Sequence, residues 1–157
     1  MAVYLTDKDW SPRFDSAFFT CKIISRTLRE TPPNDGYAIG TKGNHPAVYY
    51  HIKVNMGKKE LIVKRRFSQF RVLYEELKKS PPAEVSLEQK QQFNHVHLPP
   101  KACFFQKIDD EFLDNRQEEL TIFVHNILKI QNYSKHPAVE KFLRLDYMRD
   151  GSLADAS

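Results

Sequence analysis

Three consecutive cations, Lys64, Arg65 and Arg66, stand directly before the aromatic residue Phe67 in the stretch VKRRFSQF. The apolar residues before them follow the pattern of a strand, and those after them follow the spacing of a helix. The start of a helix presents unpaired N–H groups and partial positive charge, and therefore binds anions. Extra cations at this junction make sense if an anion sits between them. The guanidinium of Arg66 suits a phosphate because it can donate to two oxygens at once.

The two residues after this run add further chemistry. Phe67 offers a flat face on which a ring-shaped ligand could lie, and Ser68 is expected to act as the N-cap of the helix. The alternative for the pair is that Phe67 packs in the core and Arg66 binds a carboxylate of its own protein.

A second arginine, Arg116, lies on the apolar stripe of a later helix, three residues after Leu113 and four before Leu120. An arginine in that position loses hydration and is rarely left without a partner. Asp110 and Glu119 are offset from the stripe, so the partner comes from elsewhere in the fold or from a ligand. There are two alternatives: Arg116 forms a structural ion pair, or its aliphatic stem carries the guanidinium out to water.

Lys101 follows two prolines, which stiffen the backbone and would hold its charge in one place. Taken alone, it reads as an ordinary surface lysine. The four residues that follow lie outside a clear strand or helix and include two adjacent aromatics: Ala102, Cys103, Phe104 and Phe105. One aromatic could pack inside while the other touches a membrane, and the alternative is that both belong to the core.

The basic residues of the chain are concentrated. Residues 58–79 contain eight basic and three acidic residues, although the net charge of the whole chain is only +4. Such a local excess attracts a nucleic acid, a membrane surface or an acidic protein, unless it is simply a solvated basic face. The chain has no apolar run long enough to span a membrane, no signal-peptide pattern and only two cysteines, which together indicate a cytosolic protein.

Catalytic and metal chemistry find little support. The sequence contains no nucleophile-elbow, zinc-protease or phosphate-loop motif. His95, His97 and Cys103 do not follow a standard zinc spacing, and no residue is identified that would orient Cys103 as a nucleophile. We therefore expect a protein that is not an enzyme and that needs neither a metal nor a cofactor.

The periodicity predicts one α+β domain over residues 16–147, between an N-terminal arm (1–15) and a flexible C-terminal tail (148–157). Strands are expected at 18–25, around Val48 to Val54 and from Leu61, as an antiparallel meander of three strands. A long loop rich in proline and glycine, residues 27–46, joins the first two.

A helical part follows the predicted meander. Its first helix places Phe70, Leu73, Tyr74 and Leu77 on one face and ends before two prolines. The stretch from 83 to 101 is polar, and its end, residues 98–101, is expected to form an extended, polyproline-like turn. The second helix is capped by Asp109 or Asp110, and the third begins at Pro137. The apolar residues expected inside these two helices are Leu113, Leu120, Phe123, Val124, Ile127, Leu128, Val139, Phe142 and Leu143.

Three motifs together resemble the phox-homology (PX) domain in order and spacing. They are the sequences RFSQF (66–70), PPK (99–101) and FLDNRQEEL (112–120). The resemblance covers residues 16–147 and implies a three-stranded antiparallel meander packed on a helical subdomain of three or more helices, with a proline-rich linker. The chain departs from the family pattern at Val96, where a proline is common, and in the length of its 27–46 loop.

The resemblance also implies roles for single residues. Arg66 would hold the 3-phosphate of a phosphoinositide with help from Ser68, and Phe67 would stack under the inositol ring. Lys101 would meet the 1-phosphate, and Arg116 would bond the 4- and 5-hydroxyls. The loop from Ala102 through Cys103 and Phe104 to Phe105 would insert into the bilayer.

The implied function is a phosphoinositide-binding, membrane-targeting module that reads phosphatidylinositol 3-phosphate on endosomes for trafficking or sorting. Its partners would be the lipid head group and an anionic membrane surface, with protein partners through the 27–46 loop and no nucleic acid. The protein would be cytoplasmic and recruited peripherally to endosomal membranes. The alternative is a PX-fold module that binds proteins and has weak or no lipid specificity.

Overall fold

A computed structural model of the chain describes residues 13–14, 17–41, 46–103 and 105–149. Most of the predicted arm (1–15) and tail (148–157), together with Phe104, lies outside these described residues. No helix in the described ranges combines the length and the apolar composition needed to cross a membrane.

The sheet is antiparallel and has the strand order β1-β2-β3-β4. The strands are β1 (Arg13–Phe14), β2 (Ala17–Glu30), β3 (Ala47–Met56) and β4 (Lys59–Arg66). The predicted meander is confirmed as β2 to β4, with the two-residue β1 added at the edge of β2. The strand β2 continues five residues beyond its predicted end, so the long connection starts at residue 31 and not at 27.

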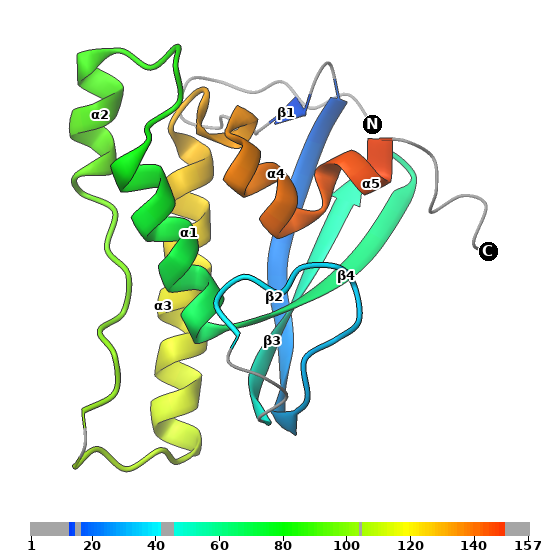
Figure 1. The fold of residues 1–157 in the computed structure, drawn as a ribbon, viewed down its shortest axis with the longest axis vertical. Coiled ribbons are helices and arrows are strands. Elements are labelled where there is room, and N and C mark those ends of the chain that lie inside the picture. The colour runs from blue at the N-terminus through cyan, green and yellow to red at the C-terminus, as the bar shows by residue number, and fades with distance from the viewer. Residues whose placement is uncertain (1–12, 15–16, 42–45, 104, 150–157) are drawn as a thin grey trace.

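Helices follow the sheet in the sequence. They are α1 (Phe67–Lys79), α2 (Leu87–Phe93), α3 (Asp110–Lys129), the 3₁₀ helix η2 (Tyr133–Lys135), α4 (Pro137–Leu143) and α5 (Leu145–Arg149). Figure 1 shows α1, α2 and α3 beside the curved sheet, with α4 and α5 along the upper part of it. The predicted α+β architecture is confirmed, and residues 96–103, which include the predicted proline-rich turn, have no helix or strand.

The predicted helix faces form the core. All six apolar residues predicted for α3 and all three predicted for α4 are buried. Together with Phe70, Leu73 and Leu77 of α1 they form one hydrophobic cluster with the sheet. Leu113 is the exception, because it is buried but does not belong to this cluster. Asp109 caps α3 by accepting a hydrogen bond from the Phe112 backbone N–H at 3.0 Å. The helix α2 was not predicted. Ser86 and Gln89 form a capping box at its start, and Phe93 anchors it in the core.

Candidate phosphate-binding site

A cavity of about 240 Å³ lies between the start of α1 and the first turns of α3. Its lining residues come from β3, α1, the linker and α3: Ala47, Val48, Tyr50, Arg66, Phe67, Ser68, Ile108, Phe112, Leu113 and Arg116. Four of the five predicted head-group residues therefore meet in one place, although Arg66 and Arg116 are 50 positions apart in the sequence.

Arg66 is the last residue of β4 and occupies the N-cap position of α1, so the prediction that Ser68 caps this helix was wrong. Its backbone N–H donates to the side-chain oxygen of Gln69 at 3.0 Å. Its Nη1 is buried and has no hydrogen-bond partner, and no carboxylate pairs with it among the described residues. Because buried donors are almost always bonded, this nitrogen marks a place for an acceptor.

Arg116 lies against aromatic rings. Its guanidinium carbon is 4.0 Å from the centre of the Phe67 ring and 4.7 Å from that of Phe112, and its Nη2 donates to the Pro100 carbonyl at 2.7 Å. Burial lowers the pKa of Arg116, but a guanidinium remains charged at neutral pH. No described carboxylate forms an ion pair with it. Arg116 thus covers one face of the Phe67 ring. A ring-shaped ligand that stacks on Phe67 must therefore lie on the opposite face of the phenyl ring or displace Arg116.

Lys101 does not line the cavity and its side chain is exposed. It follows Pro100, whose carbonyl accepts from Arg116, so the linker holds Lys101 next to the site. In the predicted insertion loop, Ala102 is half-buried, Cys103 is exposed, and Phe105 is 92% exposed. The alternative that both aromatics pack in the core is therefore wrong for Phe105.

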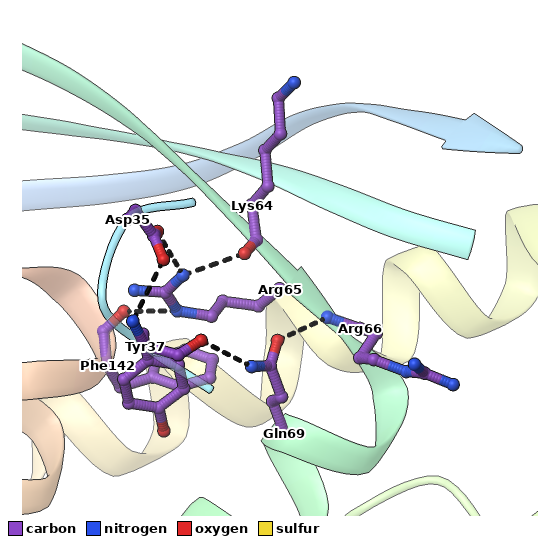
Figure 2. A network of polar contacts seen from close by, with 7 residues as sticks. All are labelled: Asp35, Tyr37, Lys64, Arg65, Arg66, Gln69 and Phe142. Carbon is purple, nitrogen blue, oxygen red and sulfur yellow. Dashed lines mark hydrogen bonds and ion pairs between the residues drawn. The ribbon is translucent and has the colours of Figure 1, made fainter. Parts of the chain in front are cut away.

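Behind the cavity, Arg65 ties three segments together (Figure 2). Its side chain is 0% exposed and pairs with Asp35 at 2.9 Å, donates through Nε to the Phe142 carbonyl at 2.9 Å, and stacks 4.1 Å from the centre of the Tyr37 ring. A buried charge of this kind is tolerated only with such a set of partners. Arg65 thus holds two segments against the end of β4: the connection after β2 and the helix α4.

The same connection also reaches the residues of the cavity. Gln69, which accepts from the Arg66 N–H, donates to the Tyr37 carbonyl at 3.3 Å. The Ser68 hydroxyl donates to the Gly40 carbonyl at 2.5 Å, so its proton is already engaged and is not free to bond a phosphate. In Figure 2 the side chain of Arg66 points away from this network. The described part of the connection therefore supports the site from behind.

Sequence reasoning missed these supporting residues. Arg65 was visible only as one of three cations, and Asp35 and Gly40 only as residues of a turn-rich loop. The signal available was the glycine itself, since Gly40 has a φ of +82°, a conformation that favours glycine. Among the described residues, no group of three His, Cys, Asp or Glu side chains is arranged to hold a metal ion.

The chain thus has a small antiparallel sheet on a helical subdomain, with two guanidiniums lining one cavity at a helix N-terminus, an arrangement suited to an anion. The sequence matches the PX domain family over residues 53–146, more than half of the chain, and the protein belongs to this family. Membership implies a phosphoinositide-binding module that targets proteins to membranes by peripheral recruitment.

The relatives agree with this assignment. The chain is 31% identical over 103 residues to the serine/threonine-protein kinase Sgk3 of Rattus norvegicus and equally to that of Mus musculus. That match covers 66% of this chain and 19% of each kinase, so the chain spans about a fifth of the length of these curated relatives. The shared part is the PX domain, which is a lipid-binding module and not a catalytic one.

Two solved structures share the fold. A designed CISK-PX domain superposes with a TM-score of 0.54 and 24% identity, covering 80% of this chain and 98% of that one. The mouse SNX19 PX domain with bound sulphate ion gives a TM-score of 0.56 and 19% identity, covering 82% of this chain and 98% of that one.

Proposed function

We propose that this PX domain binds phosphatidylinositol 3-phosphate and thereby recruits its protein to endosomal membranes for trafficking or sorting. In this proposal Arg66 binds the 3-phosphate, Phe67 supports the inositol ring, Arg116 bonds ring hydroxyls and Lys101 meets the 1-phosphate. The observation that carries it is the buried, unpartnered Nη1 of Arg66 in the cavity that Arg116 also lines.

The charge of the cavity supports a lipid with one ring phosphate besides the diester. Among the described residues, two cationic side chains line the cavity, Arg66 and Arg116, and Lys101 stands outside it. A phosphate monoester carries about −1.5 to −2 charges at neutral pH, which two guanidiniums balance. A second or third ring phosphate would enter a space of about 240 Å³ in which the described part of the chain supplies no further cation.

The structural relatives offer independent support for an anion in this fold. The SNX19 domain that resembles this chain holds a sulphate ion, and sulphate has the charge and the tetrahedral oxygens of a phosphate. The backbone N–H groups at the start of α1 add donors of the kind that bind such ions. The Ser68 hydroxyl already donates to Gly40, so in this proposal Ser68 contributes its backbone N–H to the anion.

The test is binding to vesicles of phosphatidylcholine that contain one phosphoinositide at a fixed fraction, across the set of phosphoinositides. We expect the strongest binding with phosphatidylinositol 3-phosphate. Arg66→Ala should weaken it by at least about tenfold, since a charge-assisted hydrogen bond contributes about 1.5–3 kcal/mol. The melting temperature should change little, because Nη1 of Arg66 has no hydrogen-bond partner and the guanidinium forms no ion pair within the described protein.

Arg71→Ala is the matched control. Arg71 lies on α1, the helix that Arg66 caps, carries the same charge as Arg66 and does not line the cavity. Its loss should change vesicle binding by no more than about threefold, the effect of one charge near an anionic surface. Equal losses in the two variants would show general attraction to the membrane, and unchanged binding in Arg66→Ala would favour a module that binds proteins.

A further inference from the structure

A second and larger cavity, of about 510 Å³, lies on the second half of α1. We call it the α1–α4 groove. Its walls are the connection at Tyr37 and Ile39, the face of α1 that carries Val72 and Glu76, and α4 from its first turn to Lys141 in its last turn. Its volume falls in the range of about 300–1,000 Å³ that is typical of ligand sites. It shares no lining residue with the phosphate-binding cavity.

The walls of this groove are held in place by their own contacts. The Tyr37 ring stacks on the Arg65 guanidinium at 4.1 Å and meets Phe142 edge-on at 6.0 Å. The buried His136 bridges the ends of two helices, because its Nε2 lies 2.6 Å from the Ser80 carbonyl and its Nδ1 accepts from the Ala138 N–H. A groove that is already formed costs little to order when a ligand binds.

The chemistry of the groove is an apolar surface flanked by two opposite charges. Ile39 is 53% exposed although it is apolar, and Val72 lies half-buried across from it on α1. Glu76 comes from α1 and Lys141 from α4, and among the described residues neither side chain has an ion-pair partner. The ligand that complements this surface has an apolar side chain between a basic and an acidic group.

From this complementarity we infer that the α1–α4 groove is a docking site for a short linear peptide of a partner protein. The peptide places an apolar side chain on Ile39 and Val72, a Lys or Arg near Glu76, and an Asp or Glu near Lys141. An anionic lipid fits less well, since its phosphate would face Glu76 as well as Lys141. The inference goes beyond membrane recruitment, because it gives the domain a second ligand.

Both ligands can be bound at once. Ser68 of the phosphate-binding cavity and Glu76 of the groove are eight residues apart on α1. This separation is about 12 Å along the helix axis at 1.5 Å per residue. The domain can therefore hold a lipid head group at the start of α1 and a peptide farther along the same helix.

The first experiment selects peptides from a displayed library of random linear dodecapeptides on the whole 157-residue chain, with Ile39→Glu protein as the counter-selection. We expect enriched sequences in which an apolar residue stands between a basic and an acidic one. Ile39→Glu should keep the wild-type melting temperature because its side chain is largely exposed. Absence of any sequence that prefers the wild type to Ile39→Glu would overturn the inference.

The second experiment measures the affinity of one enriched synthetic peptide by fluorescence polarisation. Glu76→Lys should weaken it by about tenfold, because the change replaces attraction for the basic residue of the peptide with repulsion at an exposed position. A peptide whose basic residue is replaced by glutamate should regain affinity for Glu76→Lys and lose it for the wild type. Glu88→Lys, which makes the same charge change on α2 outside the groove, is the control and should have no effect.

The outcome is separable from that of lipid binding. Arg66→Ala should bind the peptide as the wild type does, whatever it does to vesicle binding. Peptides that bind Glu76→Lys and the wild type equally would contradict the docking geometry. Loss of vesicle binding in Ile39→Glu, without any peptide selected, would assign the groove to the membrane and not to a protein.

Discussion

Arg65 and Arg66 carry the same side chain at consecutive positions, yet their surroundings are opposite. Consecutive residues of a strand point to opposite faces, so only one of the two can turn towards the core. Arg65 does so and bonds to Asp35 and to the Phe142 carbonyl. Arg66 is left at the cavity with a buried nitrogen that no described residue bonds. One cation of the run holds the fold and its neighbour is available to a ligand.

At the same scale, Arg116 tests whether geometry or charge matters in the cavity. Arg116→Lys keeps the charge but removes the planar group that lies 4.0 Å from the Phe67 ring centre. We expect affinity for soluble inositol 1,3-bisphosphate to fall by about tenfold, because lysine cannot make the paired hydrogen bonds of a guanidinium. Isothermal titration calorimetry at two salt concentrations measures both the affinity and its salt dependence.

The salt dependence supplies the control for this substitution. Arg116→Lys should keep the wild-type dependence because the number of charges is the same. Arg116→Met removes the charge and should weaken both the affinity and its response to salt. Wild-type affinity in Arg116→Lys would mean that the guanidinium contributes only its charge.

Among the elements, the connection between β2 and β3 is the one that sequence patterns describe least. Apolar spacing correctly predicted the buried faces of α1, α3 and α4, because those faces repeat with the period of a helix. The helix α2 was hidden in a polar stretch with a single buried aromatic, and its signal was the capping box of Ser86 and Gln89. The contact between Asp35 and Arg65 spans 30 residues and depends on tertiary packing, which no local pattern encodes.

Two glycines of this connection make its role testable. Gly36 and Gly40 both have a φ of +82°, so alanine is strained at either position by about 1–2 kcal/mol. Gly36 has open space around it, whereas a Cβ at Gly40 would lie 3.1 Å from the Ser68 carbonyl oxygen. We expect Gly40→Ala to reduce the free energy of unfolding by about 1–3 kcal/mol more than Gly36→Ala does. Urea denaturation compares the two.

The pair of variants also reports on the site. Because Gly40 contacts the start of α1, Gly40→Ala should weaken vesicle binding under conditions in which it remains folded, and Gly36→Ala should not. Equal stability and equal vesicle binding in the two variants would mean that the connection does not support Arg66 and Ser68.

On the scale of the whole molecule, the features that would meet a membrane gather at one end. In Figure 1 the linker that follows α2 runs down to the lower end of the helical layer, where α3 begins, and α2 lies at the opposite end. Head-group contacts alone give weak binding, since a few hydrogen bonds are offset by the costs of association. Burial of an aromatic side chain in the bilayer would add about 1.5–3 kcal/mol.

Phe105→Ala tests this contribution from the bilayer. Its ring is 92% exposed, so we expect the variant to keep the wild-type melting temperature and the affinity for soluble inositol 1,3-bisphosphate. Affinity for vesicles should fall by about tenfold or more, in line with the loss of about 1.5–3 kcal/mol of apolar burial. Leu87→Ala, which removes a 74% exposed apolar side chain on α2, is the matched control and should bind vesicles as the wild type does. Equal affinity of the wild type for soluble head group and for vesicles would show that the loop stays in water and that the head group alone carries recruitment.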